Sequence, residues 1–209
     1  MKRKTIYKPI FGFASFVLAT LVMVNIAKAD GTDPLGPPSI PIAVGSDVLV
    51  EGVGLNDSQP GDITIETPAG VSIAQVLLYW SGFEGQDDTI EVEGFEVTGT
   101  EIAGSATGSP AYPYPADVTA SNWVAEGAVT TLSVGGLDFI PHNNGVFFVV
   151  ILDDGSTVDL QIRDGSDLAY LPWAEQTTPV VLPVAVSSDV RTGTVNLVVT
   201  DVKVPRPAA

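Results

Sequence analysis

The chain has 209 residues, with 25 acidic side chains against nine Lys and Arg, and it contains no Cys. The lack of Cys excludes a disulfide framework, a Cys-based metal site and a Cys nucleophile. Gly and Pro are enriched, at 21 and 16 residues, whereas a hydrophobic content of 45% is enough for a packed core, so the chain is not a disordered acidic tail.

The N-terminal segment predicts export from the cell. Four basic residues among the first eight precede an uncharged stretch from Pro9 to Ala27, and Ala27 and Ala29 are small residues at the two positions that a signal peptidase reads. This layout predicts a secretory signal helix over residues 1–29, with cleavage before Asp30. The alternative is an uncleaved anchor, because the stretch is just long enough to span a bilayer. Once cleaved, the protein is expected to be extracellular and free of the membrane.

The charge that remains after cleavage restricts the partners. Five of the nine bases lie within residues 1–29, so residues 30–209 carry 25 acids against four bases, a formal charge of −21. No Lys or Arg occurs from residue 29 to residue 162. Because the phosphates of a nucleic acid would be repelled, nucleic acid is excluded as a partner. The acidity itself indicates either solubility, as in a salty medium, or a surface for divalent cations.

The rest of the chain follows a β pattern. Residues 30–46 are rich in Gly and Pro and predict an extended leader. Beyond them, apolar and polar residues alternate with period two, with turn residues every 8 to 12 positions, as in a sandwich or barrel. Strands are predicted at residues 47–53, 62–66, 71–80, 90–93, 95–97, 129–135, 146–152, 158–162, 179–187 and 194–204.

Three segments give more specific expectations. Residues 76–80 are apolar on both faces, which is typical of a strand in the middle of a covered sheet. The most hydrophobic stretch, 146–152, precedes an Asp-Asp-Gly-Ser turn and the alternating residues 158–162, and this predicts a hairpin. The only helix candidate is a turn or two over residues 118–125, capped by Asp117. We therefore expect an all-β fold: a single jelly-roll-like antiparallel β-sandwich of about nine or ten strands over 47–204, followed by a tail at 205–209.

Short motifs occur along the chain in a characteristic order. They are Gly52-Val-Gly-Leu55, Gly61-Asp-Ile-Thr-Ile65, Pro68-Ala-Gly70, Val76-Leu-Leu-Tyr-Trp80, Asp88-Thr-Ile-Glu-Val-Glu-Gly94, Ala116-Asp-Val-Thr119, Gly145-Val-Phe-Phe-Val-Val-Ile151 and Arg163-Asp-Gly165. Because of the order and spacing of these motifs, the chain resembles an uncharacterised secreted β-sandwich domain of bacterial and archaeal surface proteins. The resemblance covers about residues 47–204. It implies a sandwich fold and a place at the cell surface, and it brings no catalytic residues.

The sequence gives little support to catalysis. His142 is the only His and lies in a turn sequence, Pro141 to Gly145. A Ser-His-Asp triad would lack the Gly-x-Ser-x-Gly elbow, and a zinc site needs three or four nitrogen or sulfur ligands. A glycosidase-like carboxylate pair from Glu84, Asp87 and Asp88 remains conceivable, but among 25 acids close pairs arise by chance. The chain is therefore predicted not to be an enzyme.

Acidic residues at strand ends make calcium a possible cofactor, and no other cofactor is predicted. Calcium takes oxygen ligands from loops, and the candidate ligands are Asp153, Asp154, Asp164 and Asp167. None of them has the EF-hand spacing, and Asp-Gly is also a common turn sequence. The alternative is that these residues form plain acidic turns.

Aromatic residues in predicted loops suggest a sugar site. Tyr112 and Tyr114 alternate with prolines, and Trp173 follows a proline, so their rings are candidates to stack on a pyranose. The alternative for the two tyrosines is packing at the rim of the core. The sequence thus favours a non-catalytic structural or adhesive module, with a cell-surface or matrix protein or a polysaccharide as partner. A carbohydrate-binding module, with or without help from calcium, is the alternative.

Overall fold

A computed structural model of the protein describes residues 35–83, 85–102, 111–140, 142–166, 180–184, 187–190 and 192–200. Within these ranges the chain forms eight strands and one short 3-10 helix, η1. They are β1 (Asp47–Val53), β2 (Gly61–Glu66), β3 (Ser72–Phe83), β4 (Thr89–Val92), β5 (Phe95–Thr98), β6 (Ala111–Asp117), η1 (Thr119–Ser121), β7 (Val129–Gly135) and β8 (His142–Asp153). The expected signal helix at 1–29 and tail at 205–209 lie outside the described residues.

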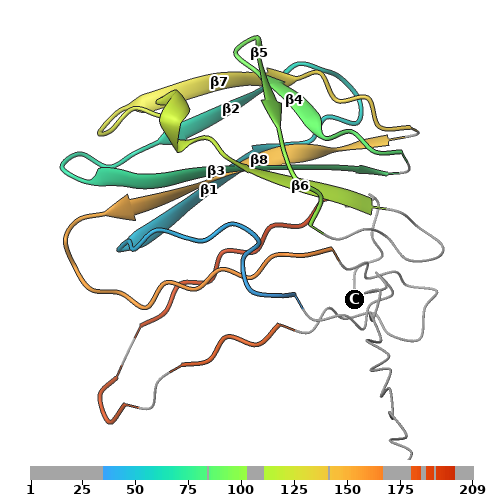
Figure 1. The fold of residues 1–209 in the computed structure, drawn as a ribbon. Helices are drawn as coiled ribbons and strands as arrows, with labels where there is room; N and C mark the ends of the chain where they lie inside the picture. The colour runs from blue at the N-terminus through green and yellow to red at the C-terminus, as the bar shows by residue number, and fades with distance from the viewer. Residues whose placement is uncertain are drawn as a thin grey trace, which may run out of the picture.

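The strands form two antiparallel sheets of four strands each. The first sheet has the order β1-β8-β3-β6 and the second has the order β2-β7-β4-β5. Figure 1 shows them as two stacked layers, with β2, β7, β4 and β5 above the first sheet. The pairing is nested, because β1 pairs with β8, β2 with β7, β3 with β6 and β4 with β5. The expected all-β, sandwich-like architecture is confirmed.

The main core lies between the two sheets. Alternate residues of each strand point inward, and their side chains form one cluster of buried residues that draws on both sheets. The largest fully buried members are Trp80, Phe148, Leu55, Ile63, Ile65, Leu78 and Ile90. Because the facing sides of the two sheets bury their apolar residues against each other, this cluster fixes how the layers pack.

The outer face of the first sheet is apolar as well, and chain segments cover it. Leu77, Tyr79 and Val149 are buried there against Ile40 and Ile42, among other residues. Figure 1 shows the blue segment before β1 and the orange segment after β8 running beneath this sheet. The expectation that residues 76–80 belong to a strand covered on both sides is therefore confirmed.

The predicted hairpin between 146–152 and 158–162 is wrong. β8 lies between β1 and β3, so both of its edges are already paired and none is left for the residues that follow. Within the described range 154–166 the chain makes one isolated bridge, between Gly36 and Asp164. The described parts of 179–187 and 194–204 also lack a ladder, so the described residues contain eight strands and not nine or ten.

The sequence reasoning missed strand β6, whose Tyr-Pro-Tyr-Pro stretch was expected to be a loop. Proline lacks the N–H that a central strand needs, but it is tolerated at a sheet edge. β6 is such an edge strand. The carbonyls of Pro113 and Pro115 accept hydrogen bonds from the N–H groups of Ile102 and Thr100.

The helix expected after Asp117 is present only as η1. Its first residue, Thr119, donates its N–H to Oδ1 of Asp117 at 3.0 Å. The turn ends at Asn122, whose backbone is in the left-handed conformation. No helix among the described residues is long and apolar enough to cross a membrane.

Candidate functional site

The aromatic residues expected to bind a sugar do not form a platform. Tyr114 is only 2% exposed and packs in the core, 5.9 Å from Trp80 and 6.2 Å from Phe139 between ring centroids. Its ring therefore has no open face for a ligand, which corrects that part of the expectation. Tyr112 packs half-buried against the same core, and Trp173 lies outside the described residues.

Burial of Tyr114 makes the domain sensitive to alkali. Desolvation, followed by the carboxylates of Glu101 and Asp88, raises the pKa of Tyr114 to about 12. An unfolded tyrosine titrates near pH 10, so the fold favours the neutral phenol. We expect this contribution to stability to be complete below pH 10 and to be lost as the pH rises toward 12. Urea unfolding of the wild type and of Tyr114→Phe across this range measures it, because the variant should lose less stability.

Tyr112→Phe is the matched control for this titration, because Tyr112 lies in the same strand but is not fully buried. It should keep the pH dependence of the wild type. The interpretation fails if Tyr114→Phe loses stability with pH as steeply as the wild type does.

Two of the candidate calcium ligands close a turn at the end of β8. Oδ1 of Asp153 accepts the N–H of Gly155 at 2.8 Å, and Oδ1 of Asp154 accepts the N–H of Ser156 at 2.8 Å. The hydrogen bonds from Ser156 lower the pKa of the exposed Asp154 carboxyl. This geometry is that of the acidic turn which the sequence left open as the alternative.

Asp164 lies elsewhere, on the outer face of the first sheet. Its carboxylate accepts the Ser39 N–H at 2.9 Å, the Ser39 hydroxyl at 2.6 Å and the Tyr79 hydroxyl at 3.0 Å. Tyr79 pairs with Phe147, six residues before Asp153 on β8, a distance of about 20 Å along a strand. Asp164 therefore cannot share one ion with the turn at the end of β8.

The remaining candidate, Asp167, lies outside the described residues. Within the described ranges, no group of three or more His, Cys, Asp or Glu side chains is placed to hold a metal ion. The contact of Asp164 with Ser39 and Tyr79 was not foreseen. Asp164 was a candidate ligand only because it lies in an Asp-Gly turn sequence. A turn sequence does not indicate which residues the Asp side chain contacts.

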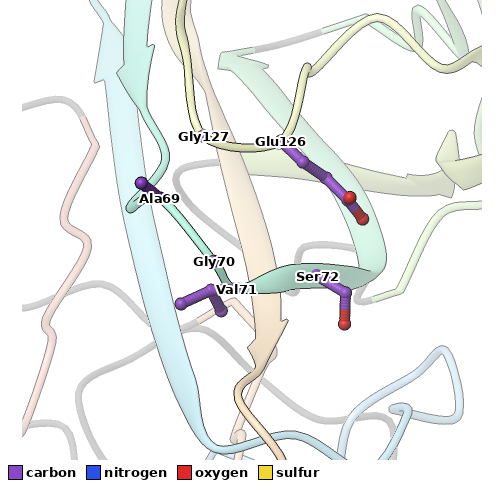
Figure 2. Close-up of a pocket in the computed structure, with 6 residues that line it drawn as sticks. All are labelled: Ala69, Gly70, Val71, Ser72, Glu126 and Gly127. Atoms are coloured by element: carbon purple, nitrogen blue, oxygen red, sulfur yellow. The ribbon is translucent and has the colours of Figure 1, made fainter.

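A shallow hollow lies beside the turn between β2 and β3. It has a volume of about 410 Å³ and is lined by residues 69–72 together with Glu126 and Gly127 (Figure 2). Its polar side chains are already engaged, because Glu126 accepts the N–H of Ile73 and Ser72 donates to the carbonyl of Asp153. With no aromatic ring among its lining residues, this hollow has little to offer a ligand.

A larger groove lies where β1 ends and β8 begins, and we call it the β1–β8 groove. It has a volume of about 810 Å³, and residues 197–200 of the C-terminal region form part of its wall. Asn56, Asp57, His142, Asn143 and Asn144 bring polar side chains to it, and Phe147 brings an aromatic ring. The sequence signal for it was the Pro141 to Gly145 stretch, which had been interpreted only as a turn.

Comparison of the chain with protein-family models, with curated proteins and with solved structures found no match. The sandwich-like fold alone does not assign an activity, because one fold carries many functions. A functional assignment must therefore come from the sites that the chain itself presents.

Proposed function

We propose that this protein is a non-catalytic structural or adhesive module, secreted or held at the cell surface. The observation that carries the proposal is the closed construction of the domain. The two sheets share one buried core, and the outer face of the first sheet is covered by residues 35–46 and by Ile162. Such a body presents loops and sheet edges to a partner and holds them rigidly.

The hydrogen bonds of the outer face support the same proposal. Gln75, a buried polar residue of β3, accepts the N–H of Ala43 and donates to the carbonyl of Pro41. Asp164 joins Ser39 to Tyr79 on the same face. The segment before β1 is thus fastened to the sheet at two separate points, which suits a module that must keep its shape outside the cell.

We further propose that the fold is a jelly roll and that the chain belongs with the secreted surface domains it resembles. The nested pairing of the eight strands supports the first statement, since a jelly roll is an eight-stranded double sheet. The order of the motifs and the export signal support the second. Calcium has no part in the proposal, because Asp164 lies apart from Asp153 and Asp154.

A carbohydrate-binding module is the second candidate, and the β1–β8 groove is the observation that favours it. The groove combines amide side chains with an aromatic ring, a combination that suits sugars. The partner of the module would then be a polysaccharide of the cell surface or matrix, in place of a protein.

Retention on the cell envelope tests the proposed function. Protein recovered from the culture should begin at or near Asp30 by intact mass, and it should sediment with purified envelope or matrix of the producing cells. Bovine serum albumin, which is also acidic, is the control for sedimentation caused by charge alone. The proposal would be contradicted if the protein stayed in the supernatant after sedimentation with envelope or matrix. Enzymatic turnover of envelope components by the protein would contradict it as well.

A further inference from the structure

We propose that the β1–β8 groove binds an uncharged oligosaccharide. The inference rests on the second proposed function, a carbohydrate-binding module, and names the class of saccharide that the groove would take. The groove, of about 810 Å³, has the size of a ligand site. Three properties carry the proposal: the asparagines that line the groove, the aromatic residue among them, and the nearly neutral lining.

The groove gathers neutral polar side chains in a chain that otherwise uses acids. Three of the six asparagines of the whole chain and its only histidine line it. Oδ1 of Asn143 accepts the N–H of Phe139 at 3.0 Å, which fixes the side chain and directs its amide nitrogen away from that bond. Among the described residues, the side chains of Asn144 and His142 have no hydrogen-bond partner. Amide and imidazole groups pair with vicinal sugar hydroxyls, because both can donate and accept.

Two glycines that line the groove bring its two strands into close contact next to Phe147. Gly52 pairs with Phe147, and a Cβ on Gly52 would lie 2.7 Å from the Cβ of Phe147. At Gly145, where φ is +153°, a Cβ would lie 2.5 Å from the carbonyl oxygen of Val53. A side chain at either position would collide with the neighbouring strand, so these two glycines allow the close packing of β1 on β8 that builds the groove.

Phe147 lines the groove, and its ring is held in place by a neighbouring aromatic side chain. It stacks on Tyr79 with a centroid distance of 5.0 Å and an interplanar angle of 2°. An aromatic ring held in this way can cover the apolar face of a pyranose without losing much conformational entropy on binding. The groove thus combines an apolar contact with the polar side chains at its rim.

The charge of the groove selects the class of saccharide. Asp57 is the only acidic residue among the lining residues, and no Lys or Arg is present. The domain around the groove is strongly acidic, so its field repels uronates and sulfated sugars. An uncharged ligand is not subject to that repulsion. An extended peptide would pair with the edge strand β1 through its backbone and would make little use of the asparagine amides. The amides therefore favour a saccharide, and the peptide is tested as the other occupant.

The only histidine provides the test, because untagged protein gives a single imidazole C2 proton signal. We expect at least one linear hexasaccharide of glucose, mannose, galactose, xylose or N-acetylglucosamine to shift the His142 signal saturably. A galacturonate hexasaccharide and an uncharged Ser/Thr/Val peptide should leave it unchanged. Asn144→Ala and Asn56→Ala should each weaken the Kd by about three- to tenfold, as expected for one hydrogen bond.

Gln86→Ala is the matched control, because Gln86 is an exposed amide outside the groove that donates to Glu101. It should bind like the wild type. Asn56 is exposed, so its variant remains informative if Asn144→Ala is poorly folded. The proposal is overturned if no neutral saccharide shifts the His142 signal or if both Asn variants bind a saccharide like the wild type. It is also overturned if the peptide or the galacturonate shifts the signal and the neutral saccharides do not. Sedimentation with the envelope in the absence of saccharide binding would overturn this inference alone, whereas saccharide binding without sedimentation would count against the adhesive function.

Discussion

Replacing Phe148 with Ala should lower the free energy of unfolding by about 3–5 kcal/mol, as expected for a large ring removed from a packed core. Phe148 is fully buried between the sheets, and it lies on the central strand β8 opposite Leu78 of β3 and Glu51 of β1. The neighbouring strands are fixed by their ladders, so the cavity can collapse only in part. Urea denaturation followed by tryptophan fluorescence measures the loss, with Trp80 as a reporter in the same core.

Two other phenylalanines set the scale for this variant. Phe147→Ala should cost less, about 1–3 kcal/mol, because Phe147 is half-buried on the outer face and loses mainly its stack on Tyr79. Phe95→Ala should cost below about 1 kcal/mol, because Phe95 is 64% exposed. Equal losses from all three substitutions would mean that β8 is not the central strand described above.

The strands that could be predicted are those with a local signal, either alternating polar and apolar residues or a continuous apolar run as in β3 and β8. β1 and β7 begin and end at the residues that the alternation indicates, 47–53 and 129–135. β6 was missed because its two prolines argue against a strand in the middle of a sheet, and only the tertiary fold places it at an edge. Local pattern therefore predicts a strand well and its neighbours in the sheet poorly.

The false hairpin after β8 has the same cause. The Asp-Asp-Gly-Ser turn and the alternation at 158–162 are local signals, and a turn does form there, with Gly155 and Ser156 bonded to the preceding aspartates. The pairing of β8 with β1 and β3 involves residues far away in the sequence. Both edges of β8 are paired with strands that are distant in the sequence, so neither is free for residues 158–162. A local turn signal carries no information about such long-range pairing.

The candidate site was less predictable than the fold. The acidic turn that the sequence left as an alternative is found at Asp153 and Asp154, whereas Asp164 forms a bridge with Gly36. Whether these residues could share one calcium ion depended on distances that the sequence does not contain. The β1–β8 groove is formed by the end of one strand, the start of another and a segment near residue 198. Its polar residues are about ninety positions apart in the sequence, from Asn56 to Asn144, so their meeting is a property of the β1–β8 pairing.

Replacing Asp164 with Ala should loosen the chain around Ser39 on the first sheet, while the bonds of Gln75 to Pro41 and Ala43 remain. The substitution removes the acceptor for the Ser39 N–H, the Ser39 hydroxyl and the Tyr79 hydroxyl, and it leaves that hydroxyl half-buried without a partner. Hydrogen bonds to a charged group are worth more than neutral ones, so we expect a total loss of about 2–3 kcal/mol. Amide hydrogen exchange at Ser39 to Ile42 should speed up by about 30-fold or more, because local opening then costs about 2 kcal/mol less.

The titration of Tyr79 gives an independent measure of the same contact. Burial first, and the Asp164 carboxylate second, raise the pKa of Tyr79 well above its ordinary value. Asp164→Ala removes the second cause, so the pKa of Tyr79 should fall while burial still keeps it above that of a free tyrosine, as followed by absorbance at 295 nm. Asp159→Ala is the matched control, because Asp159 accepts from the nearby Gln161 and does not touch Tyr79. Unchanged exchange at Ser39 together with an unchanged Tyr79 titration would show that Asp164 does not hold the segment before β1 to the sheet.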